Sequence, residues 1–306
     1  MNRAFRNSYV FAASLTVLGS ILFSTKAVVI KLAYEYHIDS LSLLGLRMFF
    51  SLPFFVATLL FLGKGKKREP ISKRDWWAML GVGILGFYIA SYADFIGLQY
   101  LSASLERMVL YSYPTLVLLL SAIFFRKKIT RIQLLALVIT YLGIAIIFSG
   151  KISAVGNKNP LLGAIFVFTA ALTYAMYLVG SGQLLPRIGT RRFTAWSMIA
   201  AATVVLAHNA IANGLDLFQF PVEIYGLAFF MAIFATVLPT FMISEGIRII
   251  GANNASIIGA IGPVSTILLA YLLLDERLFP IQWLGTFIVI GGVLVITLSK
   301  SEGRGD

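Results

Sequence analysis

Cysteine is absent from the 306 residues, and charged residues make up only 12% of them, against ~25% in soluble proteins. Without cysteine the chain has no disulfide framework and no thiol or cysteine-ligated metal chemistry. The shortage of charge excludes a soluble protein of this length, because too few charged side chains remain to cover a water-exposed surface. Histidine is also scarce: His37 and His208 form no HExxH pattern, so no metal site or cofactor is expected.

Apolar residues are abundant instead, at 59% of the chain with a mean hydropathy of +0.88. They gather in stretches of about 20 residues, the length that crosses a hydrocarbon core of ~30 Å. The first stretch is too long for a cleaved signal peptide and carries Lys26 and Lys31. We therefore predict an all-α polytopic membrane protein with ten transmembrane helices, at residues 9–34, 41–62, 76–97, 103–125, 132–149, 161–181, 193–213, 223–246, 252–274 and 281–299.

The net charge of +12 comes from basic residues that lie mainly in every second loop between these spans. With the N-terminus inside, 18 lysines and arginines fall in inner segments and three in outer loops. Short cytoplasmic loops of membrane proteins carry this excess of basic residues. We therefore expect both termini in the cytoplasm, and the charge predicts orientation rather than nucleic-acid binding.

An internal repeat appears when the chain is shifted by 149 residues. The shift predicts two units, residues 1–150 and 151–306, with five spans each. An odd number of spans places the second unit upside down relative to the first, as in many secondary transporters. The aligned pairs are Gly97 with Gly246, Ala103 with Ala252, Pro114 with Pro263, Gln133 with Gln282, Gly143 with Gly292 and Lys151 with Lys300.

Several short motifs resemble the EamA-type families of the drug/metabolite transporter superfamily. They are GSILFSTK at residues 19–26, KLAY at 31–34, LR at 46–47, GP at 262–263, DERL at 275–278 and GGV at 291–293. The resemblance covers nearly the whole chain and implies a bacterial inner (plasma) membrane protein with five plus five spans. It implies transport of small organic metabolites, often outward, and specifies the substrate poorly.

Ionisable groups inside spans are costly to bury and mark candidate functional sites. Lys26, Arg47 and Asp94 lie deepest, and either line or gate a pathway or form a structural ion pair between helices. Three others, Lys31, Glu106 and Arg107, lie near enough to helix ends to reach the interface. Glu245 is expected to pair with Arg248 three residues later.

Helical spacing adds polar residues to the candidate pathway. Arg107 shares a face with Tyr111 and Pro114, and Tyr88 shares one with Ser91 and Asp94. Helix packing or an interfacial position is the alternative for the tyrosines. Pro114 and Pro263, at equivalent points of the two units, either act as hinges or shape static kinks. The remaining candidates are Tyr174, Tyr177 and Asn253.

These observations predict a secondary transporter, with a small molecule and the lipid bilayer as partners. The surplus of cations over anions in the spans favours a carboxylated or zwitterionic substrate, with amino acids and related compounds as the leading class. An importer or facilitator of another class, such as nucleoside-like compounds, is the first alternative. An intramembrane lipid-acting enzyme is more remote, because the carboxylates in the spans lie beside cations; a membrane sensor is as remote, because no soluble output domain is attached.

Overall fold

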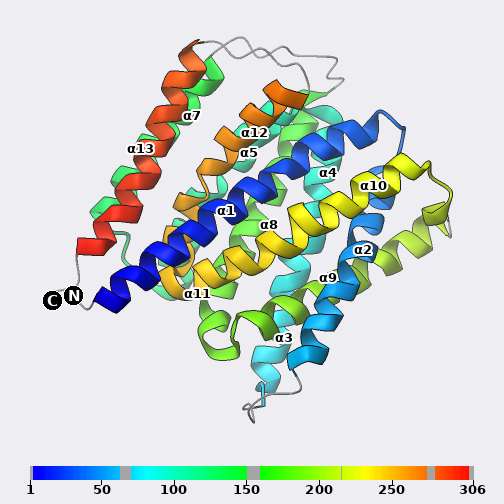
Figure 1. Cartoon of the computed structure of the whole chain (residues 1–306), viewed down its shortest axis with the longest axis horizontal. Coiled ribbons are helices and arrows are strands. Elements are labelled where there is room, and N and C mark those ends of the chain that lie inside the picture. Colours follow the sequence, from blue (N-terminus) through cyan, green and yellow to red (C-terminus); the bar gives the residue numbers. More distant parts are fainter. Residues whose placement is uncertain (1–2, 63–69, 150–158, 215, 274–279, 303–306) are drawn as a thin grey trace.

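A computed structural model describes residues 3–62, 70–149, 159–214, 216–273 and 280–302 (Figure 1). The regular structure of these residues is helical throughout. Seven helices or joined helices are long and apolar enough to cross a membrane, which supports a multi-pass membrane protein. They are α1 (Arg3–Tyr34), α2 (Ser40–Leu62), α3 to α4 (Lys73–Tyr100), α5 to α6 (Leu105–Phe125), α8 (Pro160–Ile188), α9 (Thr190–Asn213) and α10 to α11 (Val222–Ile258).

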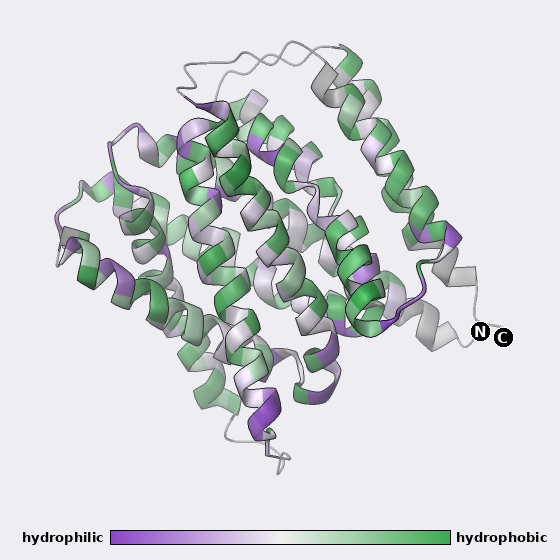
Figure 2. Ribbon diagram, turned by 180° about the vertical axis from the view of Figure 1, so that it is seen from behind, coloured by the Kyte–Doolittle hydropathy of each residue, from purple (hydrophilic) through white to green (hydrophobic). Residues whose placement is uncertain are grey.

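Local sequence signals set where several helices begin. Ser72, Ser102 and Asn159 each precede a helix and accept a hydrogen bond from the backbone N–H three residues later. A capping side chain satisfies one of the unpaired donors at a helix start. The hydropathy colouring shows mostly apolar helices with polar residues gathered toward their ends (Figure 2). This distribution is what a bilayer requires.

Two of the long spans contain a π-helical turn at matching positions. In the first, α3 (Lys73–Gly83) passes through Ile84–Ile89 into α4 (Ala90–Tyr100). In the second, α10 (Val222–Ala232) passes through Ile233–Val237 into α11 (Leu238–Ile258). A shift of 149 residues places Ile84 on Ile233. Such turns occur mostly as single insertions, frequently at functional sites.

The fourth predicted span is broken. It consists of α5 (Ala103–Leu110) and α6 (Tyr113–Phe125), which are separated at Tyr111 and Ser112. The expected boundary between spans 223–246 and 252–274 coincides with a kink at Gly251, where φ is +80° and the backbone is not helical. Helix α11 runs on across this kink to Ile258, and α12 (Ile261–Leu273) follows. The ninth predicted span is thus also divided into two short helices.

The two prolines at equivalent positions lie just after these breaks rather than inside a continuous helix. Pro114 is in the first turn of α6, and Pro263 is the third residue of α12. Proline fits the first turn, because the N–H that it lacks would have no intrahelical acceptor there. The sequence suggested kinks within helices; the structure instead shows helices that end and start again before each proline.

Helices α7 (Arg131–Ser149) and α13 (Pro280–Glu302) form a separate pair at one side of the bundle (Figure 1). They pack closely at two glycines: a Cβ on Gly143 would lie 2.7 Å from Val289, and one on Gly292 would lie 2.7 Å from Thr140. These contacts are equivalent under the same shift of 149 residues. Elsewhere α1 packs on α11 and α12, α4 on α8, and α2 on α9, so the centre lies between helices of both halves of the chain.

Candidate functional site

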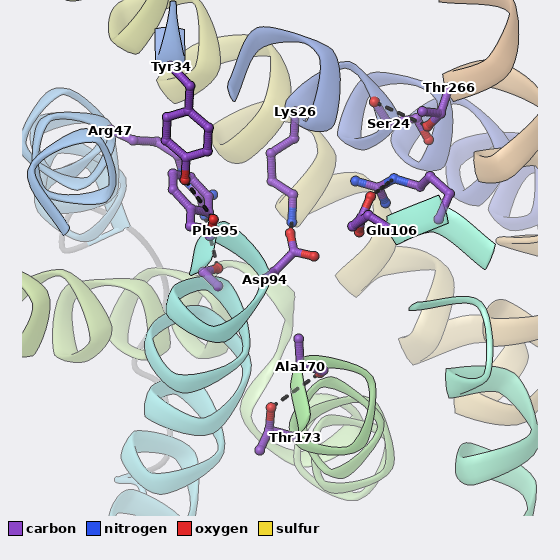
Figure 3. A network of polar contacts seen from close by, with 12 residues as sticks. Ser24, Lys26, Tyr34, Arg47, Asp94, Phe95, Glu106, Ala170, Thr173 and Thr266 are labelled. Atoms are coloured by element: carbon purple, nitrogen blue, oxygen red, sulfur yellow. Dashed lines mark hydrogen bonds and ion pairs between the residues drawn. The ribbon is translucent and has the colours of Figure 1, made fainter. Parts of the chain in front are cut away.

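Five ionisable side chains meet in the interior, although they come from four helices. Figure 3 shows Lys26 on α1, Arg47 on α2, Asp94 on α4 and Glu106 on α5. Arg107 follows Glu106 on α5. All are buried, with at most 5% of each residue exposed. Burial of so many charges is expensive unless they compensate one another or serve a function.

Two ion pairs organise this ionic cluster. Lys26 Nζ lies 2.6 Å from Asp94 Oδ2, and Arg107 Nε lies 2.9 Å from Glu106 Oε2. Three cations therefore share two carboxyl groups, and the cluster has an excess of positive charge.

Arg47 supplies that excess. It is fully buried, and no ion pair with a carboxylate forms within the described residues. Its Nη2 donates a long hydrogen bond of 3.4 Å to Ser91 Oγ, and its guanidinium carbon lies 5.4 Å from the centre of the Phe95 ring. Its Nε and Nη1 have no hydrogen-bond partner among the described residues. A buried donor without an acceptor is unfavourable and is a signature of an incomplete polar site.

Arg107 connects the cluster to a central cavity. The cavity has a volume of about 40 Å³, well below the ~300–1,000 Å³ of pockets that hold organic ligands. It has room for a few water molecules in this conformation. The lining comes from α1, α5, α6, α8, α11 and α12: Ser20, Phe23, Ser24, Arg107, Leu110, Tyr111, Tyr113, Tyr174, Ile243, Gly259, Gly262 and Pro263.

Aromatic rings form one wall of this cavity. Tyr174 stacks on Phe23 with ring centres 6.1 Å apart and meets Tyr113 edge to face at 5.3 Å. The Tyr111 hydroxyl donates to the carbonyl of Ile257 at 3.2 Å, close to the end of α11. Such rings can pack on an apolar or aromatic ligand, while their hydroxyl groups fix the surrounding helices.

Other predicted site residues lie apart from the cavity. The Tyr88 hydroxyl contacts His208 Nδ1 of α9 at 3.0 Å, because Tyr88 belongs to the π-helical turn, where the side-chain spacing differs from that of an α-helix. Tyr177 is buried against Phe87 and does not line the cavity. Asn253 Oδ1 accepts a hydrogen bond of 2.7 Å from Ser121, which joins α11 to α6.

The expectation that Glu106 and Arg107 reach the interface is wrong. Both are buried, because the break after α5 directs this short helix into the bundle. Lys31 is half-buried, and its Nζ donates to the Leu98 carbonyl at 2.6 Å. The pair between Glu245 and Arg248 forms as expected. The resemblance motif at residues 275–278 lies outside the described residues.

Side chains from the two halves of the chain are in contact at both ends of the bundle. At one end, Asn213 Nδ2 of α9 donates to Ser42 Oγ of α2 at 3.0 Å and to Asp39 Oδ1 at 3.4 Å. At the other, Arg187 Nη1 of α8 lies 3.2 Å from Asp75 Oδ1 of α3. Trp76 and Trp196 meet edge to face at this second end, with ring centres 4.8 Å apart.

The predicted pathway did not include Phe23 or Tyr113, and Glu106 was expected near the interface instead of in the centre. Phe23 precedes Lys26 by three residues and therefore shares its helix face, a signal that was available. Glu106 and Tyr113 belong to the two short helices that an uninterrupted span could not predict. Their position follows from the break at residues 111–112.

The described chain is thus a polytopic helical membrane protein with a buried charged and aromatic centre. The sequence profile of the EamA-like transporter family matches residues 10–149 and again residues 161–298. The chain belongs to this family of transporters.

Two curated relatives from Bacillus subtilis (strain 168) are similar along most of the chain. The uncharacterized transporter YcbK is 33% identical, with 90% of each chain covered. The uncharacterized transporter YyaM is 26% identical, with 78% of this chain and 76% of the relative covered. A solved structure titled "Crystal structure of protein" has a TM-score of 0.74 and 19% identity, covering 96% of this chain and 99% of the other. That likeness supports the fold alone.

Proposed function

We propose that this transporter carries small organic metabolites with a carboxylate, zwitterionic compounds such as amino acids included. The observation that carries the proposal is the buried surplus of cations beside an aromatic cavity. Arg47 has no carboxylate partner among the described residues, and Arg107 belongs both to the cluster and to the cavity lining. A substrate carboxylate would supply the missing negative charge, and the rings would contact its apolar part.

The proposed mechanism is alternating access between two inverted repeats. Support comes from the two matches to the family profile, from the π-helical turns at equivalent positions and from the divided fourth and ninth spans. The cavity of about 40 Å³ is too small for a metabolite while the two halves contact each other at both ends. Loading therefore requires one end to open, and release requires the other end to open.

We place the protein in the plasma membrane with both termini in the cytoplasm and propose export as its direction. The excess of basic residues in the predicted inner loops supports the orientation. The family resemblance supports export.

An untargeted comparison of metabolites inside and outside cells tests substrate and direction together. Cells that express the chain should accumulate specific carboxylated compounds in the medium, while cells that express Arg47→Met should not. Equal membrane levels of the two proteins are the required control. Accumulation of only uncharged compounds would contradict the proposed substrate class, and loss from the medium would contradict export.

Reconstituted vesicles then test the charged cluster directly. Lys26 or Arg47 replaced by Met or Gln should abolish uptake of the identified compound while the protein stays folded by circular dichroism. Full transport activity after both replacements would contradict the assignment of Lys26 and Arg47 to the substrate site.

A further inference from the structure

Two glycines line the central cavity, and the first of them has its missing side chain replaced by a neighbour. Gly259, at the break before α12, faces Tyr113 of α6. A Cβ at Gly259 would overlap the Tyr113 hydroxyl, which donates to the Ser256 carbonyl at 3.3 Å. An aromatic side chain therefore already fills the space beside Gly259.

The second glycine, Gly262 of α12, leaves its space open. Among the described residues, a Cβ at this position would meet one atom of another element within 4 Å, the Oγ of Ser24 on α1 at 3.1 Å. The backbone does not require glycine here, because the described glycines with positive φ lie elsewhere, at Gly189, Gly214 and Gly251. The missing side chain of Gly262 thus leaves room in the cavity.

A glycine that serves helix packing has different surroundings. A Cβ on Gly19 of α1 would lie 2.9 Å from Ile243 and 3.1 Å from Met242, both on α11. Gly19 therefore allows two helices to approach closely, as small residues do in membrane proteins. Gly262 does not meet such a wall of neighbouring atoms.

The internal repeat shows that the two halves contribute unequally to the cavity. A shift of 149 residues places Leu110 on Gly259 and Tyr113 on Gly262. All four residues line the cavity. The first half thus supplies large side chains and the guanidinium of Arg107, whereas the second half supplies space at the same positions.

Ser24 lies opposite Gly262 and borders this space from α1. Figure 3 shows Ser24 beside Thr266, whose hydroxyl donates to the Ser24 carbonyl at 3.4 Å. Thr266 lies one turn after Gly262 and on the same face of α12. The hydroxyl of Ser24 donates to the Ser20 carbonyl of its own helix at 2.7 Å. Its removal would therefore widen the cavity without breaking that contact between α1 and α12.

Resting on the proposed function, we propose that Gly262 and Ser24 together set the size of the largest apolar group that a substrate can carry. The substrate carboxylate binds Arg107, and its apolar part occupies the space between α12 and α1 at these two residues. A methyl group added at Gly262 shortens this space, and loss of the Ser24 hydroxyl lengthens it. One methylene group too many or too few in an apolar pocket changes rates roughly 10- to 200-fold.

Transport of amino acids of increasing size by the full chain in reconstituted vesicles tests this limit. Labelled alanine, leucine and phenylalanine are the probes, since they share their charged groups and differ in their apolar part. Gly262→Ala should lower the ratio of the phenylalanine rate to the alanine rate roughly tenfold, and Ser24→Ala should raise it. The double variant Gly262→Ala/Ser24→Ala should return toward the wild-type ratio.

Gly291→Ala is the matched control for this ratio. It adds the same methyl group to α13, where a Cβ meets no atom of a neighbouring element within 4 Å and does not line the cavity. Its ratio should equal that of the wild type. An equal fall in the rates of all three amino acids in Gly262→Ala would overturn the size limit, because it would indicate a general structural defect. A double variant with a ratio as low as that of Gly262→Ala would overturn it too.

A single cysteine in the cavity separates this inference from the proposed substrate class. Ser20→Cys adds one thiol to the lining of a chain without cysteine, and methyl and benzyl methanethiosulfonate label it without a carboxylate. In this background Gly262→Ala should lower the ratio of benzyl to methyl labelling rates, and Ser24→Ala should raise it. If no amino acid is transported but this ratio changes, the proposed substrate class fails and the size limit stands. A labelling ratio that neither variant changes would contradict the size limit whatever the substrate is.

Discussion

Arg47 and Lys26 are both buried cations, but their replacement should affect stability differently. Lys26→Met leaves Asp94 without its 2.6 Å partner, and loss of one member of a buried pair costs about 3–5 kcal/mol. Arg47→Met removes a charge that has no ion-pair partner among the described residues. It should therefore leave the free energy of unfolding unchanged or raise it.

Thermal unfolding in detergent measures this difference. Lys26→Met should unfold at a lower temperature than the wild type, and the double variant Lys26→Met/Asp94→Asn should recover most of the loss. Lys26→Met and the double variant should both fail to transport substrate. An equal loss of stability in Arg47→Met and Lys26→Met would show that Arg47 has a structural partner.

At the scale of elements, the contact between α7 and α13 depends on two glycines in equivalent positions. Gly292→Ala would place a Cβ 2.7 Å from Thr140 of the partner helix, and overpacking of this kind costs about 1–3 kcal/mol. Gly291→Ala is the matched control, because a Cβ at that position would meet no atom of a neighbouring element within 4 Å. The expected result is a lower unfolding temperature for Gly292→Ala only. Equal unfolding temperatures for Gly292→Ala and Gly291→Ala would contradict this, because they would show that α7 and α13 move apart easily to make room for the added methyl group.

At the end of the bundle near Asp39, Asn213 of α9 connects to Ser42 of α2 through a hydrogen bond that one substitution can remove. Asn213→Ala removes its hydrogen bonds to Ser42 and Asp39, and a loss of about 1 kcal/mol shifts an open–closed equilibrium about fivefold. Because the chain has no cysteine, Ser24→Cys places a single thiol in the cavity. The rate at which a maleimide labels this thiol reports opening of the end near Asp39, and Asn213→Ala should raise it. Thr203→Ala, whose hydroxyl bonds only within α9, is the control and should leave the rate unchanged.

At the scale of the whole molecule, the orientation can be tested with the same cysteine-free background. Arg74 and Ala212 are exposed at opposite ends of the bundle. In intact cells an impermeant maleimide should label Ala212→Cys and should reach Arg74→Cys only after the membrane is opened. The reverse pattern would invert the orientation that the basic loops predict.

The sequence predicted the helical class and most span positions, because apolar length is a strong signal. It also selected Lys26, Arg47 and Asp94 for their depth. It did not predict the divided spans, because Tyr111 to Ser112 and Gly259 to Ala260 interrupt helices without interrupting hydropathy. Consequently the burial of Glu106 and the separation of Tyr177 from the cavity depend on tertiary packing that a linear pattern does not contain.

Arg47 has no ion-pair partner among the described residues, and this has a consequence for the empty carrier. In the closed carrier without substrate, the charge of Arg47 is uncompensated and shielded from water. The change between the two open states, which passes through this closed form, should therefore be slow. A bound carboxylate compensates the charge and should speed the same passage. We therefore expect exchange of labelled for unlabelled substrate to be faster than net flux, and a membrane that holds this protein to stay tight when substrate is absent.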